Sequence, residues 1–199
     1  MRHASQPEDR KRALRSQMLD LRGQLPLEEA ARRSEAAQGH LLASPFWRNA
    51  RTVALYMPIR READTGLLCA RAGIEGKSVL LPRCAAGREL ELVVCNDAAQ
   101  LGPGSYGILE PLPSLPAVDL EDPAQVPQLL IAPCLAVDRR AHRLGYGGGY
   151  YDRLLSRPAL QTILCVALVY AMQIVDSLPV EDWDRRLHGV CSEEGFLWA

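Results

Sequence analysis

The sequence lacks an excess of charge of either sign: 23 lysines and arginines stand against 24 aspartates and glutamates, a formal net charge of −1. Proteins that bind nucleic acid or anionic membrane surfaces usually carry a basic excess. The composition therefore favours neither class, and we expect no nucleic-acid or membrane partner. An apolar run of about 18 residues would indicate a transmembrane helix, and no run approaches this length.

Disulfide and metal-ligand patterns are missing as well. The six cysteines form no C-x-x-C pair, and no histidine lies at zinc-ligand spacing from two of them. Several lie in apolar runs such as "ILCVALV", which is typical of reduced, buried thiols. The polar N-terminal stretch "MRHASQPEDRKRALRSQ" has no apolar signal core. We therefore expect a cytoplasmic protein.

The length and apolar content fit one folded unit. With 199 residues, 48% of them hydrophobic, the chain can bury a sizeable core, and we predict a single domain over residues 1–199. The segment 5–43 reads as helical. In its first helix, Leu14, Met18 and Leu21 recur at spacings of four and three, which predicts one apolar stripe.

Short apolar runs dominate the rest of the chain and are continuous rather than alternating, apart from "ELELVVC". Continuous runs separated by helices indicate strands buried on both faces, so the sequence predicts an α/β fold: three layers, α/β/α, around a mainly parallel sheet. We also expect a helix at 65–73 and a turn-rich segment at 101–128. The expected strands are 52–58, 77–82, 89–95, 128–133 and 162–170.

A glycine-rich stretch, "RLGYGGGYYDRLL", follows the fourth of these strands and holds four glycines and three tyrosines. With a helix starting near Tyr150, such a loop presents backbone N–H groups to an anion. Arg143 adds a forked donor for phosphate oxygens, and Asp152 is a hard oxygen ligand suited to Mg²⁺. The residues thus predict an anion-binding loop, with a glycine-rich turn beside packed tyrosines as the alternative.

Other catalytic motifs are incomplete. A Walker A loop needs a lysine followed by Ser or Thr, and G-x-G-x-x-G fails because Tyr150 occupies its third glycine position. "PGSYG" departs from the nucleophile elbow G-x-S-x-G because Pro103 replaces the first glycine. Cys134 and His142 could form a catalytic couple, but we favour a simpler interpretation, in which Cys134 is a small residue at a strand end and His142 is solvated.

Three charged clusters remain open on residue type alone. Lys11 and Arg15 lie one helical turn apart, and a solvated face is favoured over a binding role. Glu62 and Asp64, in "RREADT", are favoured as a solvated loop over a site at a strand end. The stretch "EDWD", 181–184, reads by default as an acidic surface turn.

These stretches together resemble one family. "RLGYGGGYYDRLL" is similar to the signature of 5-formyltetrahydrofolate cyclo-ligases, also called methenyltetrahydrofolate synthetases. "KRALR", "LYMPIRREADT", "YGILEP" and "VYAMQIVDSLPVEDWD" match the family's other motifs in the same order. The resemblance covers residues 9–193. It implies a fold like that of the ribose-phosphate-isomerase and CoA-transferase group.

The resemblance also implies an activity: ATP- and Mg²⁺-dependent closure of 5-formyltetrahydrofolate to 5,10-methenyltetrahydrofolate, with release of ADP and phosphate. A monomer acting on two small molecules, ATP and a reduced folate, is expected. Asp152 and Asp184 are implied to hold Mg²⁺, and Lys11, Arg143 and Tyr150 to act catalytically. The residues implied to bind ATP are Lys11, Arg15, Arg143, Leu144, Gly145, Tyr146, Gly147, Gly148, Gly149, Tyr150 and Tyr151. Those implied to contact the folate are Met57, Glu62, Tyr106, Tyr146, Gly147, Gly148, Gly149 and Tyr150.

Two positions depart from the family pattern. Ala141 stands where the family usually has glycine, and alanine is strained there if the turn needs a positive φ. Gly148 stands where some members have lysine, which shifts phosphate contact to the other basic groups. Two alternatives therefore stay open: a related enzyme acting on another compound, and a folate- or nucleotide-binding module without turnover.

Overall fold

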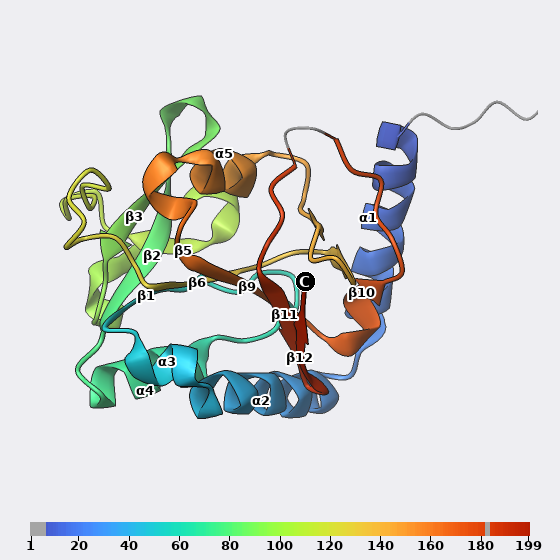
Figure 1. Ribbon diagram of the computed structural model, residues 1–199, viewed down its shortest axis with the longest axis horizontal. Coiled ribbons are helices and arrows are strands. Elements are labelled where there is room, and N and C mark those ends of the chain that lie inside the picture. Colours follow the sequence, from blue (N-terminus) through green and yellow to red (C-terminus); the bar gives the residue numbers. More distant parts are fainter. Residues whose placement is uncertain (1–6, 182–183) are drawn as a thin grey trace, which may run out of the picture.

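A computed structural model of the chain describes residues 7–181 and 184–199, built around a seven-stranded sheet of order β12-β11-β9-β6-β1-β2-β3 (Figure 1). The four central pairings, β2–β1, β1–β6, β6–β9 and β9–β11, are parallel, whereas the edge strands β3 and β12 are antiparallel. The predicted, mainly parallel sheet is confirmed. Its strands are β1 (Thr52–Ala54), β2 (Ser78–Ala85), β3 (Glu89–Val94), β6 (Leu129–Ala132), β9 (Leu164–Leu168), β11 (Gly189–Ser192) and β12 (Gly195–Trp198).

Helices cover both faces of this sheet, as the three-layer prediction requires. α2, α3 and α4 lie on one face and α5 on the other, whereas α1 stands to the side, near β10 (Figure 1). Among residues 7–181 and 184–199, no helix combines the length and apolarity needed to cross a membrane. The α-helices are α1 (Pro7–Gln24), α2 (Leu27–Ala43), α3 (Pro45–Asn49), α4 (Gly66–Ile74) and α5 (Tyr150–Ser156).

Smaller elements complete the chain. A three-stranded sheet has the order β10-β7-β8, and β4 and β5 form a two-stranded antiparallel ribbon. The short elements are β4 (Leu101–Pro103), β5 (Leu109–Pro111), β7 (Ala136–Asp138), β8 (Arg143–Leu144), β10 (Ile174–Val175), and the 3₁₀ turns η1 (Ala86–Arg88), η2 (Ala98–Gln100), η3 (Ser105–Gly107), η4 (Pro158–Leu160) and η5 (Ala171–Gln173). The segment predicted to be turn-rich thus carries a ribbon as well.

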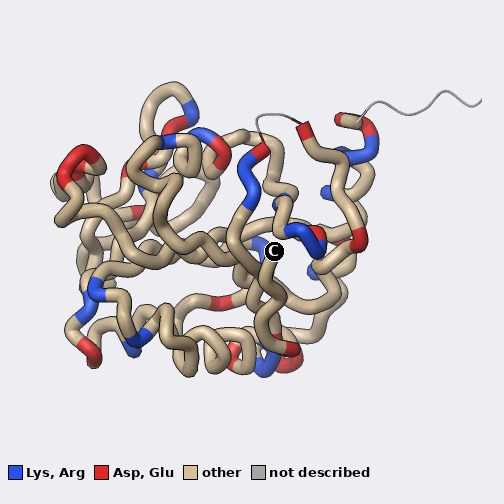
Figure 2. The backbone as a smooth tube through the Cα atoms, in the orientation of Figure 1, with Lys and Arg blue, Asp and Glu red and all other residues tan. Residues whose placement is uncertain are grey.

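The central strands are apolar throughout because both of their faces are buried. In β6, Leu129 and Ile131 pack in the core beneath α2 to α4, whereas Leu130 and Ala132 pack in the core beneath α5. β1, β6 and β9 carry no charged residue, and the charges lie mostly on loops and outer helices (Figure 2). A strand solvated on one face would alternate instead.

Two strand ends differ from the prediction by three residues or more. The run 52–58 is a strand only over its first three residues. β2 continues through Pro82 to Ala85, although we expected the proline to end it. β1 pairs with β2 only as far as Leu80, so beyond it β2 bonds to β3 alone. A proline fits where its missing N–H faces no partner strand.

Helix α1 buries a face that is only partly apolar. Met18 packs against Leu135 and Leu144 near the smaller sheet, but Leu21 is 37% exposed, so the predicted stripe is wrong at that position. Lys11 and Arg22 are buried instead. Positions 11, 18 and 22 share a face because seven and eleven residues are close to whole numbers of helical turns.

Candidate active site

The glycine-rich loop joins β8 to α5, and the helix begins at Tyr150, as predicted, whereas the short strand before the loop was not expected. Gly147 and Gly149 have φ of 95° and 69°, values that residues with a side chain adopt only with strain. A Cβ at Gly148 would lie 2.7 Å from the Tyr150 ring. A packed tyrosine therefore accounts for one glycine, as the alternative interpretation expected, and backbone conformation accounts for two. Charged side chains also contact the loop and its ends.

The turn that leads into the loop contains the departure at Ala141. Its φ is 59° and it is 1% exposed, so alanine does occupy a left-handed conformation. The buried carboxylate of Asp138 holds this turn by accepting hydrogen bonds from the backbone N–H groups of Arg140 and His142. His142 also turns its ring to Asp138, with 3.2 Å between Nδ1 and Oδ2, and burial raises the pKa of the Cys134 thiol to about 12. Neither feature supports a Cys–His nucleophile.

Arg143 is fixed at the start of the loop. Its Nη2 donates to Asp152 Oδ1 at 2.7 Å, and its guanidinium lies over the Tyr151 ring, 5.4 Å from the centroid. Its Nε is buried and has no hydrogen-bond partner among residues 7–181 and 184–199. Burial raises the pKa of Tyr151 well above its usual range, so the ring faces this cation as a neutral phenol. The structure thus joins the predicted phosphate-binding arginine to a predicted metal ligand.

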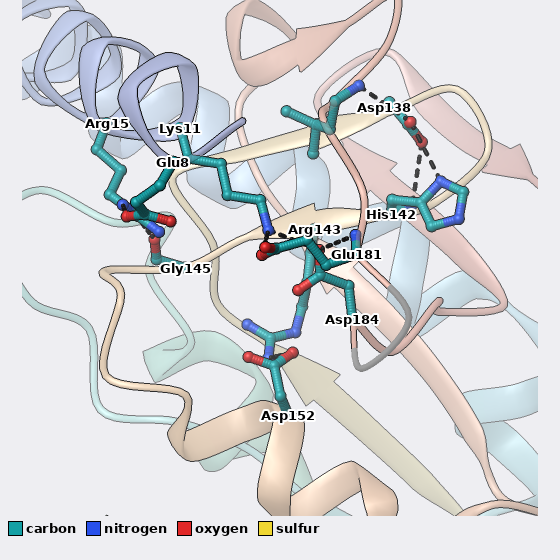
Figure 3. A network of polar contacts seen from close by, with 11 residues as sticks. Glu8, Lys11, Arg15, Asp138, His142, Arg143, Gly145, Asp152, Glu181 and Asp184 are labelled. Atoms are coloured by element: carbon teal, nitrogen blue, oxygen red, sulfur yellow. Dashed lines mark hydrogen bonds and ion pairs between the residues drawn. The ribbon is translucent and has the colours of Figure 1, made fainter. Parts of the chain in front are cut away.

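Lys11 joins the N-terminal helix to the acidic stretch near the C-terminus. Its ammonium donates to Glu181 Oε2 at 2.6 Å and to Asp184 Oδ2 at 2.8 Å (Figure 3). Burial lowers the pKa of Lys11, but the bonds to Asp184 and Glu181 outweigh burial and raise it. The solvated-face interpretation is therefore wrong for Lys11, and residue type alone gave no signal for Glu181.

Arg15, on α1, contacts the backbone of the loop directly. Its Nε donates to the Gly145 carbonyl oxygen at 3.1 Å, while Nη1 donates to Glu8 at 2.7 Å (Figure 3). A Cβ added at Gly147 would lie 3.4 Å from the Arg15 guanidinium carbon. Basic groups of α1 and the bare backbone of the loop therefore face each other across a short distance.

Glu62 lies in a buried polar cluster rather than a solvated loop. Its Oε1 accepts from the Tyr146 hydroxyl at 2.9 Å, its Oε2 accepts from the Ile59 N–H at 3.0 Å, and Arg22 Nη1 is 3.9 Å from Oε1. Burial raises the pKa of Glu62, opposed by the Ile59 hydrogen bond and the Arg22 charge. Asp64, by contrast, bonds to the first N–H groups of α4. The sequence analysis missed Arg22, although its helical register with Lys11 was readable.

The side chains of Tyr106 and Tyr150 contact each other where the loop ends and α5 begins. Their hydroxyl oxygens are 2.9 Å apart, and their rings are nearly perpendicular with centroids 6.2 Å apart. The hydrogen bond with Tyr106 raises the pKa of Tyr150. Tyr106 is 76% exposed on a positive-φ turn, and Glu110 braces the same turn by accepting the Ser105 N–H at 3.2 Å. The glutamate of "GILEP" thus supports the tyrosine.

Met57 lies in a different environment. It lines a cavity of 300 Å³ on the α4 side of the sheet, together with Cys69, Val79, Leu81 and Cys95. No residue of the segment 143–152 lines that cavity. The structure therefore places Met57 at this cavity, which the loop does not line.

The match to known proteins agrees with this arrangement. Residues 7–193 match the 5-formyltetrahydrofolate cyclo-ligase family. The chain belongs to this family. It is 33% identical to 5-formyltetrahydrofolate cyclo-ligase of Mycolicibacterium smegmatis over 203 aligned residues, covering 94% of this chain and 96% of the relative. It is 27% identical to the Haemophilus influenzae cyclo-ligase, covering 91% and 96%.

Two solved cyclo-ligase-family structures share the fold. Aquifex aeolicus 5,10-methenyltetrahydrofolate synthetase superimposes with a TM-score of 0.81 at 34% identity, covering 94% of this chain and 92% of that one. The Mycoplasma pneumoniae synthetase superimposes with a TM-score of 0.71 at 22% identity, covering 92% and 98%. The resemblance drawn from the sequence motifs is confirmed.

Proposed function

We propose that this cyclo-ligase-family chain closes 5-formyltetrahydrofolate to 5,10-methenyltetrahydrofolate with ATP as co-substrate, releasing ADP and phosphate. One observation carries the proposal: a single glycine loop contacts two different polar environments. Tyr146 bonds to the buried carboxylate of Glu62, while Gly145 and Arg143 contact Arg15 and Asp152. A site for a neutral, flat heterocycle and a site for phosphates can therefore adjoin through the loop.

The chemistry needs positioning more than a nucleophile. A formamide is a poor electrophile because its nitrogen lone pair delocalises into the carbonyl group. Transfer of the γ-phosphoryl group of ATP to the formyl oxygen turns that oxygen into a leaving group. The neighbouring aniline-type nitrogen then attacks the formyl carbon and releases its proton, the bond between that carbon and the phosphorylated oxygen breaks, and phosphate leaves as the imidazoline ring closes. Orientation and charge stabilisation supply most of the rate in such transfers.

The fixed positions of the basic side chains support a role in binding phosphates. Lys11 and Arg143 each bond to carboxylates in this structure, Lys11 to Glu181 and Asp184, and Arg143 to Asp152. We assign Lys11, Arg15 and Arg143 to the triphosphate oxygens. Fixed donors cost little reorganisation when charge develops on the transferring group. The loop N–H groups and the Tyr150 hydroxyl would complete the donors.

A Mg²⁺ site fits the carboxylates present. Within residues 7–181 and 184–199, no cluster of three or more His, Cys, Asp or Glu side chains forms an all-protein metal cage. Mg²⁺ bound with nucleotides typically needs only one or two carboxylates, with phosphate oxygens and waters completing its shell. Asp152 and Asp184 would hold the ion, which neutralises phosphate charge when bound. In this structure the carboxylates of Asp152 and Asp184 form ion pairs with Arg143 and Lys11.

The folate is assigned to the other side of the loop. The Glu62 carboxylate would accept hydrogen bonds from the pterin edge beside Tyr146, and the rings of Tyr106 and Tyr150 offer flat surfaces for packing. Met57 stays a prediction from the family resemblance. A monomeric state and a cytoplasmic location likewise stay predictions.

The test is the absorbance of the methenyl product, followed with 5-formyltetrahydrofolate and Mg²⁺ in the presence and absence of ATP. We expect product only with ATP and one ADP per product. The matched pair Lys11→Ala and Arg12→Ala separates a buried site lysine from its exposed neighbour on α1. No ATP-dependent product would refute the proposal; folate binding without turnover would favour a binding module, and ATP-dependent turnover of another formylated compound would favour a related enzyme.

A further inference from the structure

Arg22 is an unusual residue to find inside a protein. It is 0% exposed, near the C-terminal end of α1, and belongs to none of the predicted ATP- or folate-binding positions. Arginine is rarely fully buried unless its charge is paired, because removing it from water is costly. Its position therefore needs a reason beyond the packing of the helix.

Its guanidinium contacts two segments that lie far apart in the chain. Nε donates to the Arg60 carbonyl oxygen at 3.0 Å, and Nη2 donates to the Tyr146 hydroxyl at 2.6 Å. Nη1 lies 3.9 Å from Glu62 Oε1 and has no hydrogen-bond partner within the part of the chain that the structure describes. Arg22 thus connects α1 to the turn after β1 and to the glycine loop.

The direction of the hydrogen bonds around Tyr146 follows from the groups involved. Arginine can only donate, so the Tyr146 hydroxyl accepts from Nη2 and its single proton is left for Glu62 Oε1. The second carboxylate oxygen of Glu62 accepts from the Ile59 N–H. Both oxygens of Glu62 are therefore fixed, and burial raises the pKa of Tyr146 to about 12, which keeps the phenol protonated for this role.

Stability alone is a weak explanation for this arrangement. Replacing a buried ion pair by well-packed apolar residues is often neutral or stabilising, whereas its geometry specifies how the paired segments lie. Glu62 and Tyr146 lie 84 residues apart in the chain, and Arg22 is the group that touches both. Its contribution is the relative placement of the Glu62 turn and the loop.

We propose that Arg22 is a positioning residue: through Tyr146 it fixes the Glu62 carboxylate relative to the glycine loop, so that a reduced folate bound at Glu62 meets the phosphoryl group bound at the loop. This inference rests on the proposed function. Because Arg22 is fully buried, it acts through Tyr146 and Glu62 and makes no contact with substrate.

Arg22→Lys is the first test variant, because it keeps the buried charge but lacks the planar fork that reaches Arg60 and Tyr146 together. Equilibrium binding of 5-formyltetrahydrofolate without ATP should weaken by roughly tenfold or more, about 1.4 kcal/mol. ATP binding should change far less, because Lys11, Arg15 and Arg143 are untouched. Arg12→Lys, at an exposed position of the same helix, is the control and should leave both affinities unchanged.

A double-mutant cycle with Tyr146→Phe tests the route of the effect. If Arg22 acts through the Tyr146 hydroxyl, the combined variant should bind the folate no more weakly than the worse single variant, a non-additive result. Tyr146→Phe changes a half-exposed residue and leaves the buried charges of Arg22 and Glu62 in place. It therefore also supplies the test if Arg22→Lys fails to fold. A purely structural role would lower the urea midpoint without this pattern.

Three results would overturn the inference: folate affinity within twofold of wild type in a folded Arg22→Lys or Tyr146→Phe variant, equal weakening of folate and ATP binding, or additive effects in the cycle. They are distinct from failure of the proposed function, which would appear as absent folate binding or turnover in the wild-type protein itself.

Discussion

Replacing Ala141 by glycine should leave the free energy of unfolding nearly unchanged, because three effects of similar size oppose one another. An L-residue in the left-handed region costs about 1–2 kcal/mol, which glycine would relieve at φ 59°. Glycine gives the unfolded chain more freedom, a loss of about 0.4–1 kcal/mol. The methyl group of Ala141 is 1% exposed, and its burial is worth about 0.8 kcal/mol.

The sum lies within about 1 kcal/mol of zero. In a chain of 199 residues such a change moves the thermal midpoint by no more than about 4 °C. Urea unfolding followed by circular dichroism would measure it, with Ala141→Val as the contrasting variant. A β-branched side chain at positive φ should destabilise the protein by more than about 1 kcal/mol.

Ala141→Gly also tests whether the departure from the family pattern matters for turnover. The Asp138 carboxylate holds this turn through backbone N–H groups, so the loop should begin in the same geometry with alanine or glycine. We expect kcat/KM for 5-formyltetrahydrofolate within a factor of two of the wild-type value. A gain or loss of stability above about 2 kcal/mol, or a large change in kcat/KM, would show that the accounting of strain and burial at Ala141 is wrong.

Other variants test the remaining parts of the site. Arg143→Ala should raise the KM for ATP more than tenfold, because a hydrogen bond to a charged group contributes roughly 1.5–3 kcal/mol. Asp152→Ala should raise the Mg²⁺ concentration needed for half-maximal rate. Normal kinetics in both variants would refute the assignment of the loop. Gly148→Ala should displace the Tyr150 ring, which lies 2.7 Å from the added Cβ, and lower turnover while the urea midpoint falls only slightly. Burial raises the pKa of Asp138, but hydrogen bonds from backbone N–H groups, that of His142 first, outweigh burial and lower the pKa. Its contribution to stability is therefore present above the unfolded-state pKa and lost as pH falls through the folded-state value; Asp138→Asn should flatten that acid loss in urea midpoints measured between neutral pH and about pH 3.

The architecture was readable from the sequence because its signals are local. A run such as "LLIAP" is apolar at every position, and the structure shows the reason: Leu130 faces one core and Ile131 the other. The glycine loop and the helix start at Tyr150 also follow from neighbouring residues, since glycine is needed where φ is positive at Gly147 and Gly149. Pro82 misled the prediction because whether its missing N–H matters depends on which strand lies beside it.

The charged residues show the opposite case. From residue type alone, Lys11 and Glu62 read as solvated, yet both are buried. The partners that make burial tolerable lie far along the chain: Glu181 is 170 residues from Lys11, and Tyr146 is 124 residues from Arg22. Only the family resemblance pointed to binding roles for Lys11 and Glu62, and it was silent on Arg22 and Glu181.

The division has one physical cause. Periodicity of apolar residues, turn-forming glycines and prolines, and a specific loop motif act over a few residues, so the linear sequence determined the α/β architecture, the loop and the family. The pairing of a buried charge is decided by which distant segments the closed fold brings within hydrogen-bond distance. The tertiary structure alone therefore decided that Arg22, Tyr146 and Glu62 form one buried network, and that Lys11 shares its proton donors between Glu181 and Asp184.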